Sequence, residues 1–284
     1  MGFEERAVSF ACRGDALYGV LSLPPGACTR GVVIVVGGPQ YRAGSHRQFT
    51  LLARSLAAQG IAALRFDYRG MGDSEGETRS FETVDEDLRA ALDYFLGAVP
   101  GLRQVVLWGL CDAASAALMY APSDKRVSGL VLLNPWIRTQ DGLARTTLKH
   151  YYRGRLLEAD FWRQVVRGKF ALGRSLASMF GLVRVAFGSA RSGTTGTGTA
   201  SLPERMHAGM RQFGGQVLLI VSGADLTGRE FCDLTDSTPA WKRLLDTPRV
   251  TRRLLDHADH TFSRRDWRDQ VAAWTGDWVN SLPG

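Results

Sequence analysis

The sequence predicts an α/β fold, with a mostly parallel central sheet covered by helices on both faces. Short runs of apolar residues alternate with segments whose apolar residues recur at helical spacing, as in buried parallel strands connected by helices. One such pair, at residues 105–120, is joined by a Gly-x-Cys-x-Ala sequence that fits a sharp turn between a strand and a helix. Residues 136–206 break the alternation and predict a separate helical cap.

The chain opens with a predicted hairpin, because residues 6–12 and 16–23 alternate in character around Arg13-Gly14-Asp15. Runs typical of strands buried on both faces then lie at residues 31–36, 61–66, 104–108, 129–133, 217–221 and 250–255. Helical spacing of apolar residues predicts helices at residues 49–59, 83–96, 112–121, 239–246 and 266–280.

The predicted cap is rich in arginine and contains amphipathic segments such as residues 161–167 and 172–187. It ends in residues 189–201, whose glycines, serines and threonines are typical of a flexible loop. We therefore predict a core made of residues 1–135 and 207–284, interrupted by a helical cap, or lid, at residues 136–206.

Composition favours a soluble protein, since 45% of the 284 residues are apolar and 22% are charged. The chain begins with polar and acidic residues, and no run approaches the roughly 20 apolar residues of a membrane span. These features predict a cytoplasmic location. The cysteines at positions 12, 28, 111 and 232 have no Cys-x-x-Cys spacing, so we expect reduced thiols and neither a zinc site nor a disulfide framework.

Cys111 is the strongest candidate for chemistry. A nucleophile elbow strains the residue at its tip and requires small residues two positions before and after it, and Gly109 and Ala113 meet this requirement. The thiol would lie at a helix N-terminus, where unpaired N–H groups and the helix dipole favour the reactive thiolate. The alternative is that Cys111 is only a small buried apolar residue, a common fate of free cysteine.

Several motifs outside the cap together resemble the α/β-hydrolase superfamily. Residues 36–40, Val-Gly-Gly-Pro-Gln, are similar to its oxyanion loop, residues 67–76 match its Asp-x-Arg-Gly-x-Gly-x-Ser-x-Gly signature, and the elbow follows the fifth strand. More narrowly, Gly-Gly-Pro-Gln-Tyr-Arg at 37–42, the sequence at 109–117 and Leu-Asn-Pro-Trp at 133–136 resemble the exosortase A system-associated hydrolases, type one. That subfamily is defined by genome context, not by a known substrate.

The resemblance implies a chain order of nucleophile, acid and histidine. Asp225 follows the apolar run at 217–221, where the superfamily carries its acid, and His260 lies after the last strand with Phe two residues later. His257 and Asp233 are the alternates, and Asp225 could instead serve only as a helix cap. A zinc site at His257 and His260 would lack further ligands, so we expect neither a metal nor a cofactor.

The resemblance also implies an oxyanion hole made of two N–H groups, each worth about 3 kcal/mol to the reaction. One would be the amide of Asp112. The other would come from the loop at Gly37–Gln40, where Pro39 has no N–H, so we predict Gln40 as the donor through its backbone or its side chain. The two glycines of this loop would equally suit a tight turn without a catalytic role.

The glycine-punctuated stretch at residues 69–76 lacks the lysine of a phosphate-binding loop and the spacing of a dinucleotide-binding fingerprint. We therefore expect it to be structural. Arg65, Asp67 and Arg69 are predicted to form an ion-pair network beneath the site.

These residues predict a cysteine-dependent acyl hydrolase, such as an esterase or thioesterase, that works through a Cys-His-Asp triad and an acyl-cysteine intermediate. Because an acyl thioester reacts readily with amines, alcohols and thiols, an acyltransferase is an alternative outcome of the same intermediate. A third hypothesis is a non-catalytic protein that binds an acyl ligand or a partner.

The net charge of +7 is concentrated in the predicted cap. Such charge could attract a small ester or thioester linked to coenzyme A or acyl carrier protein, or an anionic membrane surface in peripheral contact. A solvated face of amphipathic helices is the commoner cause of such a pattern. No recognition motif for nucleic acid accompanies the charge, so we expect no nucleic-acid partner.

Overall fold

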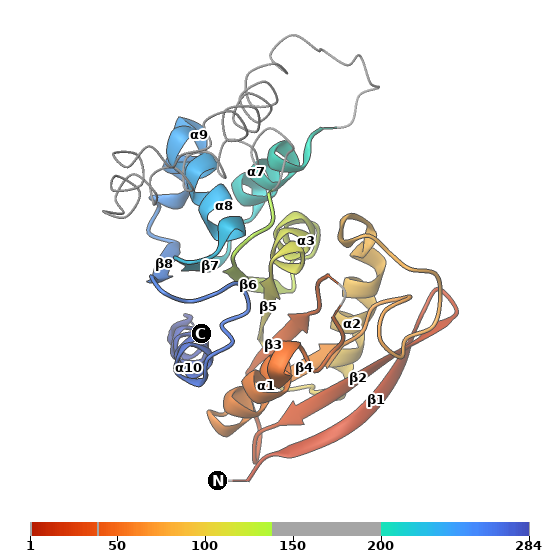
Figure 1. Ribbon diagram of the computed structural model, residues 1–284. Helices are drawn as coiled ribbons and strands as arrows, with labels where there is room; N and C mark the ends of the chain where they lie inside the picture. Colours follow the sequence, from red (N-terminus) through yellow and green to blue (C-terminus); the bar gives the residue numbers. More distant parts are fainter. Residues whose placement is uncertain (1, 39, 138–199, 284) are drawn as a thin grey trace, which may run out of the picture.

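The central sheet has eight strands in the order β1-β2-β4-β3-β5-β6-β7-β8 (Figure 1). The computed structural model describes residues 2–38, 40–137 and 200–283. The first two strands run antiparallel to their neighbours, and all pairs from β4 onward along the sheet are parallel. The strands are β1 (Glu4–Cys12), β2 (Asp15–Leu23), β3 (Arg30–Val35), β4 (Ala62–Phe66), β5 (Gln104–Leu110), β6 (Val127–Leu133), β7 (Gln216–Ser222) and β8 (Val250–Leu255).

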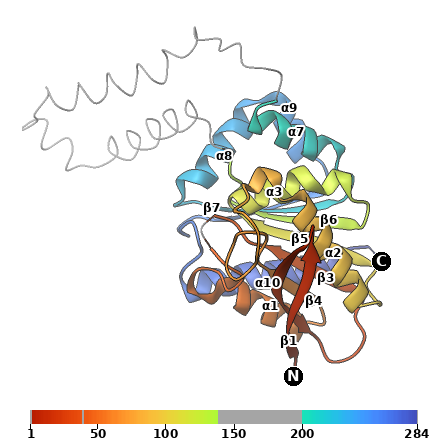
Figure 2. The same cartoon turned by 90° about the vertical axis from the view of Figure 1, so that its right-hand side faces the viewer.

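Helices cover both faces of this sheet, as Figures 1 and 2 show. One face carries α1 (Gln48–Ala58) and α10 (Arg265–Ser281). The other face carries α2 (Asp85–Ala98), α3 (Asp112–Tyr120), α7 (Leu202–Gln212), α8 (Leu226–Ser237) and α9 (Pro239–Leu245). Two layers of helices on a mostly parallel sheet confirm the α/β architecture predicted from the alternating pattern.

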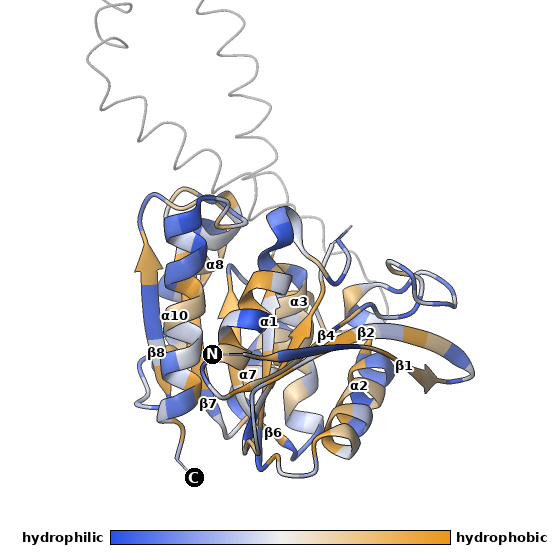
Figure 3. Cartoon of the chain, turned by 90° about the horizontal axis from the view of Figure 1, so that it is seen from below, coloured by the Kyte–Doolittle hydropathy of each residue, from blue (hydrophilic) through white to orange (hydrophobic). Residues whose placement is uncertain are grey.

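Each central strand supplies side chains to both apolar layers, because successive residues point to opposite faces. On β5, Val105 and Leu107 pack in the layer under α2 and α3, whereas Val106 and Trp108 pack under α1 and α10. Figure 3 shows hydrophobic colours along the strands, and a hydrophilic stretch on the edge strand β8, where Arg252 and Arg253 are exposed. Burial on both faces explains why the inner strands are continuous apolar runs.

The predicted hairpin and the six predicted apolar strands are all present. Helix α8 was not expected from the sequence, because Gly228 lies in its first turn and its threonines and aspartates are weak helix formers. Tertiary packing favours the helix where local propensity does not. Phe231 of α8 is buried and packs edge to face against Trp241 of α9. A helix after β7 matters for the site because it begins directly after Asp225.

The boundary predicted between cap and core falls inside a helix. Helix α7 runs from Leu202 to Gln212, across the predicted start of the second core segment at residue 207. Met206 and Met210 of this helix are buried in the same apolar layer as α3, so α7 is part of the core from its first turn. Residues 138–199, which hold most of the predicted cap and its predicted loop, lie outside the described residues.

A search of the described residues finds no helix that is both long and apolar enough to cross a membrane. Among the same residues, no group of three or more His, Cys, Asp or Glu side chains is arranged to hold a metal ion.

Candidate active site

Cys111 sits at a strained turn between β5 and α3. Its backbone angles are φ 63° and ψ −124°, a conformation that non-glycine residues avoid unless the surrounding structure imposes it. The turn is tight enough that a Cβ added to Gly109 would lie 2.5 Å from the carbonyl carbon of Ala113. These are the two small positions that the sequence predicts for a nucleophile elbow, and their close approach gives the reason.

Hydrogen bonds from the neighbouring strand hold the elbow in place. The Cys111 N–H donates to the carbonyl of Leu133, at the end of β6, over 2.9 Å. The Cys111 carbonyl accepts the N–H of Trp136 over 3.1 Å, and Ser115 on α3 donates its hydroxyl to the Trp136 carbonyl. The strained residue is thus fixed on both sides by the chain that leaves β6.

Replacing Gly109 with alanine is expected to destabilise the protein by about 1–3 kcal/mol, because the added methyl group meets backbone that cannot move aside. Gly97 on α2 is a matched control. It has no atom within 4 Å of an added Cβ, so Gly97→Ala should stabilise the helix by up to about 1 kcal/mol. Urea unfolding of both variants measures the difference. Equal effects of the two substitutions would contradict the close contact at the elbow.

The structure brings Asp225, His260 and Cys111 together from three separate loops. Nδ1 of His260 lies 2.9 Å from Oδ2 of Asp225, and the imidazole also hydrogen-bonds the thiol of Cys111. The Asp225 carboxylate is almost fully buried, whereas the His260 ring is about one third exposed. The acid, the base and the thiol therefore form a continuous chain of hydrogen bonds that runs from a buried carboxylate to the half-buried thiol of Cys111.

Electrostatics in this chain favour a charged imidazole. The hydrogen bond that His260 donates to Asp225, followed by the one with Cys111, raises the pKa of His260 to about 10. Burial opposes ionisation of Asp225, but the hydrogen bond and charge of His260 outweigh it and lower the pKa of the carboxyl. A cation beside a thiol stabilises the thiolate, the form of cysteine that attacks carbonyl carbon.

Asp225 also caps a helix. Its Oδ2 accepts the N–H of Gly228 over 2.9 Å at the start of α8, so the capping alternative and the contact with His260 are both present. The two alternates do not take these places: His257 is exposed in the loop after β8, and Asp233 lies further along α8. Asp233 was the alternate partner for the imidazole, but Nδ1 of His260 is hydrogen-bonded to Asp225.

Asn134 is a positioning residue that the sequence motif contains but that received no role from sequence reasoning. It is fully buried after β6, with φ 42°. Its amide accepts the Ser222 N–H over 2.8 Å and donates to the Ser222 hydroxyl and to the carbonyl of His260, over 2.7 and 3.1 Å. It therefore links the end of β7, three residues before Asp225, to the histidine loop. A polar residue directly after a buried strand is the signal that could have marked it.

The loop after β3 faces the elbow. Gly38 donates its N–H to Oδ2 of Asp112 over 2.9 Å, and Gln40 accepts the Ser45 N–H at its side-chain oxygen. Gln40 and Asp112 are the two donors predicted for an oxyanion hole. Among the described residues, the structure records no acceptor for the backbone N–H of Gln40, whereas the Asp112 N–H is hydrogen-bonded to its own carboxylate.

The predicted ion-pair network beneath the site is wrong in its pairing. Each charge has a different partner: Arg65 pairs with Glu5, Asp67 with Arg42, and Arg69 with Asp87 and Glu86. Tertiary contacts from other elements supply these partners, which local spacing cannot show. The pair of Asp67 with Arg42 is the one that reaches the site, because it holds the far end of the loop after β3.

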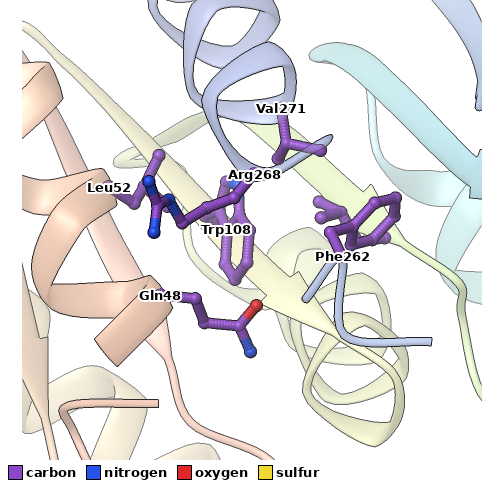
Figure 4. Close-up of a pocket in the computed structure, with 7 residues that line it drawn as sticks. Gln48, Leu52, Trp108, Phe262, Arg268 and Val271 are labelled. Atoms are coloured by element: carbon purple, nitrogen blue, oxygen red, sulfur yellow. The ribbon is translucent and has the colours of Figure 1, made fainter. Parts of the chain in front are cut away.

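A hollow lies between α1 and α10 (Figure 4). Its lining residues are Gln48, Leu52, Trp108, Leu133, Phe262, Arg268 and Val271. The Gln48 amide nitrogen and the Trp108 indole N–H are buried there with no acceptor among the described residues. Cys111 packs against the same apolar layer as this hollow, and Phe262 in its wall lies two residues after His260.

Comparison with known families agrees with this geometry. Residues 32–274 match the α/β-hydrolase family. Among solved structures, an esterase from Pyrococcus furiosus superposes with a TM-score of 0.67 at 16% identity, covering 99% of this chain and 92% of that one. A dienelactone hydrolase from Anabaena variabilis superposes with a TM-score of 0.61 at 17% identity over the whole of both chains. At these identities the structures show a shared fold.

Curated relatives match shorter stretches. An uncharacterised protein of Pseudomonas aeruginosa, PA2218, is 34% identical over 135 residues, which are 45% of this chain and 36% of that protein. The polyketide transferase grgF of a Penicillium species is 33% identical over 94 residues, or 30% of this chain and 31% of that protein. The quorum-quenching protein AidA of Acinetobacter baumannii is 34% identical over 94 residues, or 31% of each. The matches thus span about a third of the relatives' lengths.

Proposed function

The chain belongs to the α/β-hydrolase family, and on that premise we propose that it is a cysteine-dependent acyl hydrolase acting on an ester or thioester. The observation that carries the proposal is the hydrogen-bonded chain from Asp225 through His260 to Cys111 at a strained elbow. The motif resemblance to the exosortase A system-associated hydrolases is part of the proposal and supplies no substrate.

The reaction begins with the Cys111 sulfur as a thiolate beside the His260 imidazolium. The sulfur attacks the carbonyl carbon, and negative charge develops on the carbonyl oxygen beside the N–H groups of Asp112 and Gln40. As the carbon–oxygen or carbon–sulfur bond of the leaving group breaks, His260 donates its proton to that group. An acyl thioester on Cys111 remains, and the neutral imidazole is then the base for the next step.

Asp225 keeps the imidazole in the orientation that this proton transfer needs, because its carboxylate holds Nδ1 and leaves Nε2 for the sulfur and the leaving group. In hydrolysis, His260 takes a proton from water, which attacks the acyl carbon and releases a carboxylic acid. Cys111 and His260 then return to their starting forms.

An acyltransferase is the second candidate, since an acyl thioester passes its acyl group to an amine, alcohol or thiol as well as to water. The match to a Penicillium polyketide transferase favours keeping it. Carrier-linked substrates such as acyl-coenzyme A, a basic cap that attracts them, and a cytoplasmic location stay predictions from the sequence. A protein that only binds an acyl ligand would need no connected acid, base and thiol.

Intact-protein mass spectrometry after incubation with a panel of acyl thioesters tests the proposal. We expect one acyl adduct on the wild type, mapped to Cys111 by peptide analysis, and none on Cys111→Ala. Cys232→Ala is the matched control: burial raises the pKa of the Cys232 thiol to about 11, so removing it should leave the adduct unchanged. Product analysis with added amines, alcohols or thiols separates transfer from hydrolysis.

A panel that gives neither an adduct nor turnover on the wild type would count against acyl chemistry at Cys111. An adduct that persists on Cys111→Ala and disappears on Cys232→Ala would show that Cys232 is the acylated residue. That result would overturn the assignment of Cys111 as the nucleophile.

A further inference from the structure

The side chain of Asp112 connects the two segments from which the oxyanion hole of the proposed reaction is built. Its Oδ2 accepts the N–H of Gly38, in the loop after β3, over 2.9 Å. Its Oδ1 accepts the N–H of Ala113, in the first turn of α3, also over 2.9 Å. The carboxylate thus bridges the loop and the elbow beside Cys111.

The bridge is close-packed. A Cβ added to Gly37 would lie 2.1 Å from Oδ1 of Asp112 and 2.9 Å from the backbone nitrogen of Ala113. The loop backbone therefore lies directly on the start of α3, with the carboxylate between them, and only glycine fits at position 37. The site at a helix N-terminus also favours the negative charge of the carboxylate.

A second carboxylate holds the other end of the same loop. Asp67, whose side chain is fully buried, accepts the backbone N–H of Arg42 over 2.5 Å and pairs with its guanidinium. Gln40 lies between these two anchors, and its own side-chain oxygen accepts the N–H of Ser45. Because Gly38 is bonded to Asp112 and Pro39 has no N–H, the next backbone N–H along the loop is that of Gln40.

We infer that Asp112 is a positioning residue of the oxyanion hole: its carboxylate binds the Gly38 N–H and so fixes the loop that presents the Gln40 N–H to the reacting carbonyl. This inference rests on the proposed function, because an oxyanion forms only if Cys111 attacks a carbonyl. The role of the side chain is distinct from that of the Asp112 backbone N–H, which is the other expected donor.

The negative charge of Asp112 opposes the proposed reaction, whereas its hydrogen bond with Gly38 supports it. A carboxylate beside a developing oxyanion would repel it by Coulomb interaction, and this carboxylate is also close enough to His260 to feel its charge. Burial raises the pKa of the Asp112 carboxyl, while the N–H groups of Gly38 and Ala113 favour its charged form. Asparagine removes the charge and keeps one acceptor oxygen, so Asp112→Asn separates loop anchoring from repulsion.

We expect Asp112→Ala to lower kcat by about 100-fold, the usual effect of losing one oxyanion donor, with KM changed by less than about threefold. Asp112→Asn should fall between the alanine variant and the wild type. Alkylation of Cys111 by iodoacetamide should keep its wild-type rate in both variants, because displacement of iodide forms no oxyanion. Asp124→Asn is the control: it removes a buried carboxylate at the far end of α3, bonded to Tyr120 and Arg126, and should leave kcat unchanged.

Two kinetic results would overturn the inference. An Asp112→Ala variant as fast as the wild type, or faster, would show that the carboxylate only opposes the oxyanion. A loss of alkylation in parallel with kcat would show that the substitution damages the elbow itself.

Amide NMR of the full-length protein tests the anchor without any turnover. The chain has two Gly-Gly pairs, at 37–38 and 214–215, so combined ¹³C-carbonyl and ¹⁵N labelling of glycine singles out the amides of Gly38 and Gly215. We expect the Gly38 amide proton to move upfield in Asp112→Ala, while Gly215 stays in place. An unchanged Gly38 signal overturns the inference. A moved Gly38 signal in a protein that acylates no substrate would instead count against the proposed function.

Discussion

Cys111→Ala is expected to lower kcat by about 10⁴-fold or more, since residues of a catalytic triad act as a unit and losing the nucleophile removes the covalent route. The fold should survive, because the thiol is only half-buried and the elbow is held by backbone hydrogen bonds to Leu133 and Trp136. Steady-state kinetics on the thioester that gives the adduct, together with urea unfolding, measures both quantities.

Cys111→Ser is the informative companion to this variant. Its hydroxyl occupies the same place but is not converted to an anion by a neighbouring imidazolium, so we expect a slow oxyester adduct or none. Cys232→Ala should keep the wild-type rate. If Cys111→Ala retained more than about a tenth of the wild-type kcat, the residual rate would exceed what binding and an oxyanion hole alone supply, and Cys111 would not be the nucleophile.

His260→Ala is expected to change the pH dependence of Cys111 alkylation as well as to abolish turnover. In the wild type the pKa of His260 is raised to about 10, so the imidazole stays positively charged from acid pH up to about pH 10. With the imidazolium beside the sulfur throughout this range, the rate of Cys111 alkylation should change little between about pH 6.5 and 9. Without the imidazolium, the rate should rise with pH as for a free cysteine, whose thiol ionises near pH 8.5.

The alkylation rates of the wild type and of His260→Ala should therefore differ most at acidic pH. At pH 6.5 the wild type is expected to react with iodoacetamide at least about tenfold faster than His260→Ala, because only about 1% of a free thiol is ionised there. The experiment uses a Cys232→Ala background, so that Cys111 supplies the signal. His257→Ala, in the same loop but exposed, is the matched control and should follow the wild type. Parallel curves for wild type and His260→Ala would contradict an ion pair at Cys111.

The raised pKa of His260 also sets the sign of its effect on stability. A group whose folded pKa exceeds its unfolded value of about 6.5 stabilises the fold fully below that pH. This contribution is lost as the pH rises toward about 10, where the folded imidazole loses its proton. We therefore expect the difference in unfolding free energy between wild type and His260→Ala to shrink as the pH rises through this window.

Sequence alone recovered the parts of the site that depend on local order along the chain. Cys111 is recognisable because a strand, a turn with small flanking residues and a helix are consecutive, and Asp225 and His260 are recognisable because each follows a buried strand. In a parallel sheet the carboxyl ends of strands lie at one edge, so residues there meet whatever the details of packing. Helix α8 was missed because Gly228 and several threonines and aspartates in it are weak helix formers, whereas the contact of Phe231 with Trp241 is tertiary.

By itself, then, the sequence determined the order of the strands and the three side chains at the strand ends, because periodicity and turn chemistry act over a few neighbouring residues. Only the tertiary structure decided how these side chains are held: Asn134 reaching the His260 loop, Asp112 bonded to Gly38, and Asp67 paired with Arg42. Each of these hydrogen bonds joins residues at least 25 positions apart. Which donor meets which acceptor across such distances is set by packing of the whole sheet and its helices, and no local pattern encodes it.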